Sequence, residues 1–184
     1  MAYRTFFHAA KKNIQLTGAV APSSRFLIQK MIAPVDFAVT KLIVELGPGE
    51  GCITKELLKK MRADAQLIVF EKNPLFCAVL RTINDPRMVV VEDSAENMDQ
   101  YLKQRNIEQV PYIISSLPFG SLPKETAEKI HQAIHTVLAE DGRYIQFQYF
   151  LHSYLYLKKT YKKIETAFTV WNIPPAFVYV CQKG

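Results

Sequence analysis

Cysteine, glycine and proline are all scarce in this sequence of 184 residues. Three cysteines, at positions 52, 77 and 181, are odd in number and scattered along the chain. This spacing matches neither a disulfide framework nor a zinc site, so we expect reduced thiols, no bound metal and a cytoplasmic protein. Seven glycines and ten prolines are too few for a collagen-like or low-complexity chain.

Long hydrophobic runs are also missing. The longest uncharged run, 166–182, has 17 residues and is interrupted by one asparagine and two prolines. A membrane-spanning helix needs about 20 predominantly apolar residues, so none is expected. The first residues have no unbroken apolar stretch, which excludes a secretory signal.

Acidic residues are nearly absent from both ends of the chain. Residues 1–36 hold five Lys or Arg against one acid, and so do residues 155–184, which gives +4 at each end and −2 in the middle. This asymmetry indicates an anionic partner, either nucleic acid or an anionic membrane surface, although solvated lysine faces would have the same composition. Aromatic and basic residues within 1–16 alternate at helical spacing, which predicts a basic amphipathic helix.

Short apolar runs alternate with longer amphipathic segments from residue 41 onward. The short runs predict strands at 42–46, 67–70, 88–91, 112–115, 144–149, 167–171 and 177–180. The amphipathic segments predict helices at 52–62, 74–83, 96–104 and 124–139, after an earlier helix at 25–32. Strands that are apolar on both sides and alternate with helices are typical of a parallel sheet covered on both faces.

The connection before the last strand sets its direction. Only five residues, 172–176, separate the last two strands, which is too short for a crossover helix, so the last strand is predicted to run antiparallel to its predecessor. The predicted fold is therefore α/β, a Rossmann-like doubly wound, mostly parallel sheet of seven strands with an antiparallel last strand. We expect a single domain over 1–184, with a helical segment at 1–36 and the Rossmann-like core at 37–184.

A glycine-rich turn follows the first predicted strand. It reads Glu45-Leu-Gly47-Pro-Gly49-Glu-Gly51 and opens a helix, whose free N–H groups and the bare glycine backbone let a ligand approach closely. A dinucleotide fingerprint needs Gly or Ala at position 52, where this chain has Cys52, and no P-loop Gly-Lys-Ser/Thr follows. These two phosphate-binding motifs are therefore excluded at this turn.

Two further carboxylates follow the next two strands. Glu71 comes 26 residues after Glu45, where a carboxylate can accept hydrogen bonds from ribose hydroxyls in a doubly wound fold. Asp93, followed by Ser94, can receive the exocyclic amino group of an adenine. Each acid alone is commonly a solvated charge, but three at consecutive strand ends after a glycine turn predict a nucleoside site.

The fourth and fifth strands end in candidate acceptor residues. Ser115-Ser116-Leu117-Pro118-Phe119 follows the fourth strand, at the edge of the sheet where ligands bind. Its carbonyls and hydroxyls can hold an amine, and Phe119 can stack on a base or face an ammonium group. Tyr149 and His152 at the end of the fifth strand are candidate polar groups, or structural ones, and neither is assigned as a general base.

These motifs resemble those of class I S-adenosylmethionine-dependent methyltransferases. The resemblance implies that the cofactor is held by Glu45, Gly47, Gly49, Gly51, Glu71 and Asp93, with contributions from Ser94 and Ser115. It also implies that Ser24 and Arg25, in the stretch 24–27, contact the methionine part of the cofactor; the alternative is a helix start with Phe26 and Leu27 in the core. It also implies that residues 116–119, together with Tyr149, receive the methyl acceptor. A carboxylate at Glu45 would favour the cationic sulfur of this cofactor.

Two families of such enzymes compete, and a noncatalytic binding module with the same fold is the third alternative. The ribosomal RNA adenine dimethylases share the glycine turn and the Leu-Pro-Phe loop, but many have Asn where this chain has Ser116, and most carry a helical domain after the sheet. The bacterial phospholipid N-methyltransferases are similar over nearly the whole chain, including 18–25 and 172–176. Neither family accounts for the lysine-rich stretch 157–163.

The phospholipid resemblance implies methylation of the amine of phosphatidylethanolamine toward phosphatidylcholine. Residues 1–16 would then contact an anionic membrane surface, peripherally and on its inner face. RNA is the less favoured partner.

Overall fold

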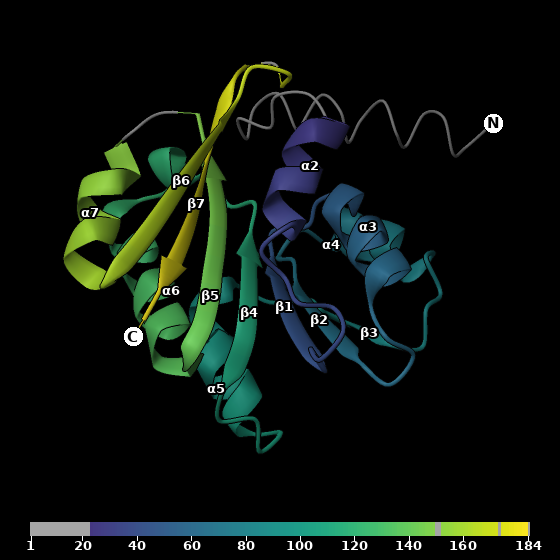
Figure 1. Cartoon of the computed structure of the whole chain (residues 1–184). Helices are drawn as coiled ribbons and strands as arrows, with labels where there is room; N and C mark the ends of the chain where they lie inside the picture. Colours follow the sequence, from purple (N-terminus) through teal and green to yellow (C-terminus); the bar gives the residue numbers. More distant parts are fainter. Residues whose placement is uncertain (1–22, 150–151, 173, 184) are drawn as a thin grey trace.

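A mixed β-sheet forms the middle layer of the protein, with helices on both of its faces (Figure 1). The computed structural model describes residues 23–149, 152–172 and 174–183. The predicted helix within 1–16 lies outside these residues and stays a prediction. The strands are β1 (Leu42–Leu46), β2 (Gln66–Phe70), β3 (Met88–Val91), β4 (Val110–Ser115), β5 (Leu138–Gln148), β6 (Lys163–Thr169) and β7 (Ala176–Gln182).

The helices alternate with these strands along the chain. They are α2 (Arg25–Ile32), α3 (Cys52–Lys60), α4 (Pro74–Arg81), α5 (Met98–Lys103), α6 (Lys124–Val137) and α7 (His152–Thr160), with short 3-10 turns η1 (Ala95–Asn97) and η2 (Phe119–Ser121).

The strand order is β3-β2-β1-β4-β5-β7-β6. The pairs from β3 to β5 are all parallel, and β7 is antiparallel to both β5 and β6. The predicted doubly wound sheet with an antiparallel last strand is thus confirmed. The chain order reverses between β1 and β4, and in such sheets ligands bind at the carboxyl ends of the strands beside this point.

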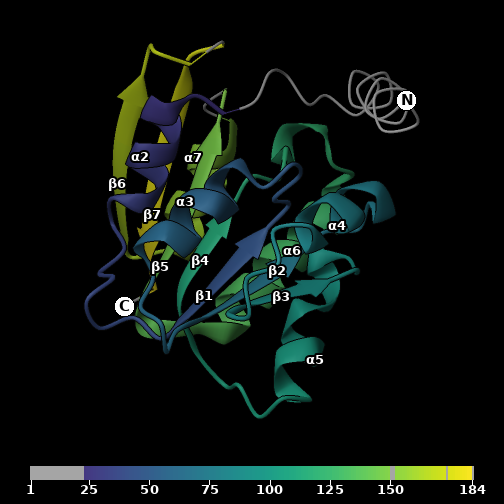
Figure 2. The ribbon, with the colours of Figure 1, turned by 90° about the vertical axis from the view of Figure 1, so that its right-hand side faces the viewer.

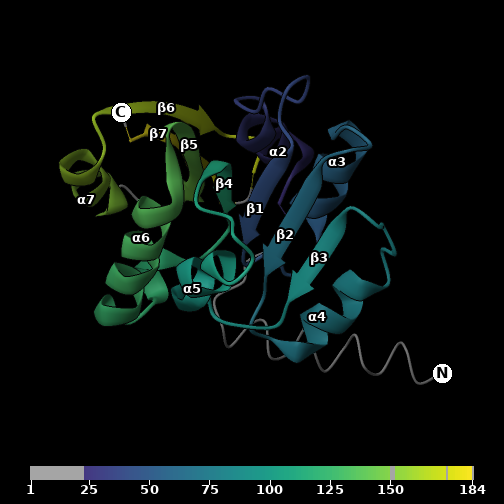
Figure 3. The same ribbon diagram turned by 90° about the horizontal axis from the view of Figure 1, so that it is seen from below.

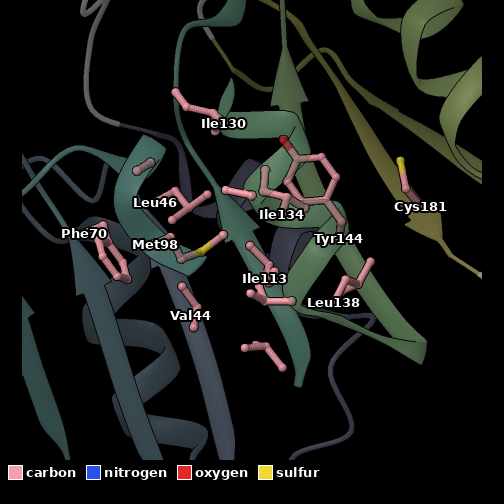
Figure 4. Packing of buried hydrophobic residues seen from close by; sticks show 14 of the residues in the cluster. Val44, Leu46, Phe70, Met98, Ile113, Ile130, Ile134, Leu138, Tyr144 and Cys181 are labelled. Atoms are coloured by element: carbon pink, nitrogen blue, oxygen red, sulfur yellow. The ribbon is translucent and has the colours of Figure 1, made fainter. Parts of the chain in front are cut away.

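Two hydrophobic cores fill the spaces between the sheet and its helices. One packs α5, α6 and α7 on the sheet, through residues such as Met98, Ile134 and Leu157 (Figure 4). The other packs α2, α3 and α4 on the opposite face, as seen from the side in Figure 2 and from below in Figure 3. Burial of both faces explains why strands such as β1 and β2 are apolar at nearly every position.

Local sequence signals set the starts of the helices on the second face. The Ser24 hydroxyl caps α2 by accepting a hydrogen bond from the backbone N–H of Leu27 at 3.2 Å, as the serine before this helix predicted. Asn73 caps α4 in the same way, and Pro74 occupies its first turn, where a missing N–H costs nothing.

Strand β5 begins earlier than predicted. It was expected from 144 onward and starts at Leu138, but its pairing with β4 jumps from Val110↔Leu138 to Tyr112↔Arg143. The intervening residues bulge out of the ladder, and Gly142 is needed there because an added Cβ would lie 2.8 Å from the Ala139 carbonyl oxygen. The regular ladder therefore begins close to the predicted start.

Strand β6 was placed too late by the sequence. It was predicted at 167–171 and spans Lys163–Thr169, whereas Val170 and Trp171 lie in the bend that follows. The charged residues Lys163 and Glu165 hid the strand because they are exposed on an edge strand, where charge is common. The unassigned lysine-rich stretch 157–163 is thus the end of α7 and the start of this edge strand.

Candidate active site

The turn after β1 holds its three glycines in the left-handed region. Their φ values are 67° at Gly47, 55° at Gly49 and 77° at Gly51, a conformation that side chains rarely tolerate. Gly51 forms the N-terminal cap of α3, so the turn leads directly into a helix start. A Cβ added to Gly49 would meet nothing within 4 Å. The backbone at Gly49 therefore faces open space, where a ligand can lie against it.

Glu45, at the end of β1, is a buried carboxylate with one free oxygen. Its Oε2 accepts a hydrogen bond from the Thr54 hydroxyl of α3 at 2.7 Å, while Oε1 is buried without a partner. Burial raises the pKa of Glu45 from 4.5 to about 8, although the Thr54 hydrogen bond opposes this shift. An unsatisfied buried oxygen is costly unless a donor or cation reaches it, so this site fits a positively charged ligand.

Glu71, at the end of β2, ties the glycine turn to the start of α4. Its Oε2 accepts the backbone N–H of Gly49 at 3.2 Å, and its Oε1 accepts that of Asn73 at 2.9 Å. Burial raises the pKa of Glu71, and the two N–H donors act in the opposite direction. The carboxylate is thereby fixed beside Gly49, and its remaining lone pairs are available to hydroxyl groups.

Asp93 and Ser94 lie at the end of β3. Asp93 Oδ1 accepts hydrogen bonds from the backbone N–H of Ser94 at 2.6 Å and from the Asn97 amide at 2.9 Å. The Ser94 hydroxyl caps η1 and donates to Glu96 at 2.9 Å. The second oxygen of Asp93 carries no such bond among the described residues, so Asp93 is the better placed of the two to accept from a ligand.

The loop after β4 touches the glycine turn. The Ser116 N–H donates to the Leu46 carbonyl at 2.9 Å, and a Cβ on Gly47 would lie 2.7 Å from Leu117 Cδ2. The buried Ser115 hydroxyl accepts the Leu117 N–H at 3.2 Å, so it is committed to shaping this loop. The predicted cofactor turn and acceptor loop are therefore in direct contact at the switch point of the sheet.

Two residues that the sequence did not single out hold this acceptor loop. Gln148, at the end of β5, donates to the Leu117 carbonyl at 3.1 Å. His131 of α6 stacks on Phe119, with ring centroids 4.3 Å apart, and both rings are buried. Burial lowers the pKa of His131 to about 4, so the ring is neutral at pH 7. No sequence pattern distinguishes these two residues from ordinary core positions.

The candidate residues at the start of α2 meet the end of β5 through Asn172. The Ser24 N–H donates to Asn172 Oδ1 at 3.0 Å, and the Asn172 amide donates to the Pro174 carbonyl at 2.7 Å. Burial raises the pKa of the Tyr149 phenol above its usual value near 10, and the nearby Asn172 side chain acts in the opposite direction. The Arg25 guanidinium lies 4.8 Å from the centroid of the Phe26 ring. Phe26, which could have been a core residue, is instead 41% exposed.

Replacement of Asn172 by alanine is expected to lower the free energy of unfolding by about 1–3 kcal/mol, because the buried amide satisfies Ser24 and Pro174 together. Asn172→Asp is the matched variant, since it keeps the acceptor for Ser24 and loses the donor to Pro174. It is expected to lose less than alanine does at about pH 4, where the carboxyl is protonated, and at least as much at pH 7, where a buried carboxylate would face the Pro174 carbonyl. Urea unfolding measures both, and a stability unchanged by alanine would contradict this role for Asn172.

Residues 23–149, 152–172 and 174–183 contain neither a metal-binding cluster nor a membrane-spanning helix. Within those ranges His, Cys, Asp and Glu side chains do not gather into a group of three or more that could hold a metal ion. The same part of the chain has no helix long and apolar enough to cross a bilayer.

The strand order, the glycine turn after β1 and the carboxylates ending β1, β2 and β3 define a class I S-adenosylmethionine-dependent methyltransferase. The free oxygen of Glu45 and the open backbone at Gly49 fit that cofactor, which carries a positive charge and no phosphate. The model of the ribosomal RNA adenine dimethylase family matches residues 22–164. The chain belongs to this family.

Individual relatives and solved structures agree with this class. The chain is 32% identical over 167 residues to an ornithine lipid N-methyltransferase of Singulisphaera acidiphila, covering 89% of this chain and 87% of that protein. It is 36% identical over 69 residues to a ribosomal RNA small subunit methyltransferase H of Polynucleobacter necessarius, covering 38% of this chain and 22% of that protein.

Two solved structures share the fold. An rRNA methylase from Streptococcus thermophilus superposes with a TM-score of 0.63 at 17% identity, covering 89% of this chain and 99% of that one. Human methyltransferase-like protein 13 in complex with SAH superposes with a TM-score of 0.67 at 13% identity, covering 85% and 82% of the two chains.

Proposed function

We propose that this methyltransferase acts on the primary amine of a membrane lipid headgroup, as in phosphatidylethanolamine or an ornithine lipid. One observation carries the proposal: the similarity to an ornithine lipid N-methyltransferase extends over 89% of this chain and 87% of that relative. The similarity to the ribosomal RNA methyltransferase H covers only 38% and 22%. A match along the whole length includes the residues proposed to receive the acceptor. A match over 38% of the chain can arise from the cofactor-binding part of the fold alone.

Six residues are proposed to hold the cofactor, three on the glycine turn and three on the strand ends. Glu71 would accept the ribose hydroxyls, Asp93 the adenine amino group, and Glu45 would face the cationic end. Gly47, Gly49 and Gly51 supply backbone that a ligand can approach. Ser24 and Arg25, which were predicted to contact the methionine part, and the hydroxyls of Ser94 and Ser115 stay predictions, and the two hydroxyls already make structural hydrogen bonds.

Residues of the acceptor loop would position the amine. When bound, S-adenosylmethionine supplies an electrophilic methyl group on a positive sulfur. The backbone at Ser116 and Leu117 is fixed by Leu46 and Gln148, so the Ser116 carbonyl can orient an amine with little reorganisation, whereas the Leu117 carbonyl already accepts from Gln148 and Phe119. A lipid ammonium of pKa near 10 must lose a proton before its lone pair can attack.

Proton removal is not assigned to a side chain of the described site. The raised pKa of Tyr149 keeps its phenol protonated near neutral pH, so Tyr149 can donate a hydrogen bond and cannot act as a base there. His131 is neutral at pH 7 but is enclosed between Phe119 and Tyr156, with ring centroids 4.3 and 4.6 Å away. The proton is therefore expected to leave to solvent before the amine is enclosed.

A methyl-transfer assay that compares amine-bearing lipids, phosphatidylcholine and ribosomal RNA tests the proposal. The full chain and S-adenosylmethionine with a radiolabelled methyl group are mixed with vesicles containing phosphatidylethanolamine or ornithine lipid, with phosphatidylcholine vesicles, or with small ribosomal subunits. Label is expected in the extracts of the amine-bearing lipids and not in phosphatidylcholine, whose nitrogen is already fully methylated. A Gly49→Val variant serves as the inactive control.

The remaining outcomes identify the competing functions. Label in ribosomal RNA would replace the proposal with an RNA adenine methyltransferase, the alternative that the family model favours. Label in no acceptor would indicate a binding module that has kept the fold. The predicted contact of residues 1–16 with an anionic membrane, and with it a peripheral location, belongs to this proposal and lies outside the described residues.

A further inference from the structure

The tip of the β6–β7 hairpin and the start of α2 expose apolar side chains together. Trp171 is 70% exposed, Val170 59%, Phe168 48% and Phe26 41%. The described residues include seven large hydrophobic side chains that are exposed, and these four belong to one end of the molecule, where α2 begins beside the hairpin (Figure 1). We name these four residues the tip patch. Scattered exposed hydrophobic residues need no explanation, but a gathered set marks an interaction surface.

The tip patch is held in place from both of its sides. The rings of Phe26 and Trp171 lie 5.8 Å apart, which joins α2 to the hairpin. Asn172, next to Trp171, accepts the N–H of Ser24 at 3.0 Å and donates to the Pro174 carbonyl at 2.7 Å. On the other face of the hairpin, Phe168 packs on Phe177 with ring centroids 4.7 Å apart. These contacts with Phe26 and Ser24 therefore hold Trp171 in its exposed position.

The tip patch lies on the same edge of the sheet as the active site. β6 and β5 are both antiparallel to β7, so their carboxyl ends lie at the same edge as that of β4. Contacts also connect the two regions, since Gln148 donates to the Leu117 carbonyl and pairs across the sheet with Phe177, on which Phe168 packs. A surface that rests on the tip patch would present its molecules beside the acceptor loop.

Together, the two segments that form the tip patch carry basic residues and no acidic ones. Residues 23–35 include Arg25 and Lys30 and no acid, and residues 166–182 include no charged residue. The Arg25 guanidinium lies 4.8 Å from the Phe26 ring, within the patch itself. Tryptophan and phenylalanine beside arginine are the side chains that favour the boundary between lipid headgroups and acyl chains.

We propose that the tip patch docks on an anionic lipid bilayer, with Trp171 and Val170 entering the headgroup boundary. The inference rests on the proposed lipid substrate, because a headgroup amine can reach the acceptor loop only if the active-site edge faces the membrane. A second copy of the chain is a poorer occupant. Four half-exposed side chains offer on the order of 400 Å², whereas a stable interface buries about 800 Å² per partner.

Trp171 is the single tryptophan of the chain, so its fluorescence reports on the tip patch alone. The full chain is mixed, without S-adenosylmethionine, with vesicles of equal parts phosphatidylglycerol and phosphatidylcholine, and separately with phosphatidylcholine vesicles. The emission is expected to shift to the blue with the anionic vesicles, and quenching by acrylamide is expected to fall about threefold. Little change is expected with phosphatidylcholine.

A pair of matched variants tests the surface itself. Val170→Asp places a charge in the tip patch and is expected to weaken vesicle binding about tenfold. Val39→Asp makes the same change at a residue that is 68% exposed but precedes β1 at the opposite edge of the sheet, and it is expected to bind as the unchanged protein does. Equal effects of the two variants would overturn the proposal.

Other results separate this inference from the proposed function. An unshifted Trp171 on anionic vesicles would overturn the docking surface, even if the chain binds the vesicles by another segment. If the Trp171 emission were already blue-shifted without lipid, and if this shift grew with protein concentration, the tip patch would be assigned to contacts between copies of the chain. The fluorescence experiment uses neither an amine-bearing lipid nor S-adenosylmethionine, so it does not depend on methyl transfer. A blue shift of the Trp171 emission would therefore support the docking surface even if the methyl-transfer assay labelled RNA.

Discussion

Replacement of Gly49 by valine is expected to raise the Kd for S-adenosylmethionine by at least about 100-fold, equivalent to about 2.7 kcal/mol. Two effects add here. The φ of 55° disfavours a β-branched side chain, so the turn would move. If the turn instead held its shape, the new side chain would project into space that is empty within 4 Å of its Cβ and that the cofactor is proposed to occupy. Isothermal calorimetry with the purified variant measures the loss.

Gly120→Val provides the control for this experiment. Gly120 also has nothing within 4 Å of an added Cβ, but its φ is not in the left-handed region and it lies in η2, directly after the acceptor loop and not on the glycine turn. Its affinity for the cofactor is expected to stay within about twofold of the unchanged protein. Circular dichroism establishes that Gly49→Val remains folded. A folded Gly49→Val protein with normal affinity would show that the cofactor does not lie on this turn.

Replacement of Glu45 by glutamine is expected to stabilise the free protein and weaken cofactor binding at the same time. The pKa of this carboxyl is about 8 in the folded protein, against 4.5 for an unperturbed group. Between these values the unfolded chain has lost a proton that the folded protein keeps, so the free energy of unfolding falls as pH rises and stays low above about pH 8. Glutamine cannot ionise and avoids that loss.

The expected gain of Glu45→Gln in the free energy of unfolding is about 2–4 kcal/mol at pH 9, with little difference at pH 5. For the cofactor the sign is opposite, because the variant lacks the negative charge that favours a sulfonium. Affinity for S-adenosylmethionine is expected to fall about tenfold or more at pH 8, and that for the uncharged sulfide product to fall less. Urea unfolding at both pH values, together with calorimetry with the two ligands, measures these effects.

Thr54→Val is the matched variant because it removes the hydrogen bond to Glu45 Oε2 and leaves the carboxylate in place. It is expected to keep the preference for the charged cofactor and to raise the pKa of Glu45 further, since this bond acts to lower it. If Glu45→Gln bound both ligands as the unchanged protein does, the cationic end would have to lie elsewhere.

Regular elements of the fold could be predicted because their signals are local. The two-sided apolar strands β1, β2 and β4 and the serine before α2 predicted their elements closely. The order of the strands follows from packing between distant segments, which a single sequence does not encode in any short pattern. The edge strand β6 and the bulge in β5 were misplaced because charged residues and a glycine resemble loop sequence.

The positions of the proposed cofactor residues were easier to predict than the contacts around the proposed acceptor loop. Glu45, Glu71 and Asp93 end consecutive parallel strands, so topology alone brings them to one edge. The contacts of His131 with Phe119 and of Asn172 with Ser24 join residues 12 and 148 positions apart. Histidine on a helix and asparagine before a proline are common in any protein. Their partners become visible only when the helices and the hairpin are placed on the sheet.

The contact between Gly47 and Leu117 limits how acceptor specificity can be redesigned. A Cβ added at Gly47 would lie 2.7 Å from the Leu117 side chain, so the two loops are packed too closely to accommodate even one additional carbon atom. A bulkier recognition sequence at 116–119 would press on the glycine turn, where the cofactor is proposed to bind, as well. We therefore expect that residues 116–119 cannot be exchanged alone to change the methyl acceptor, and that the glycine turn would have to be replaced together with them.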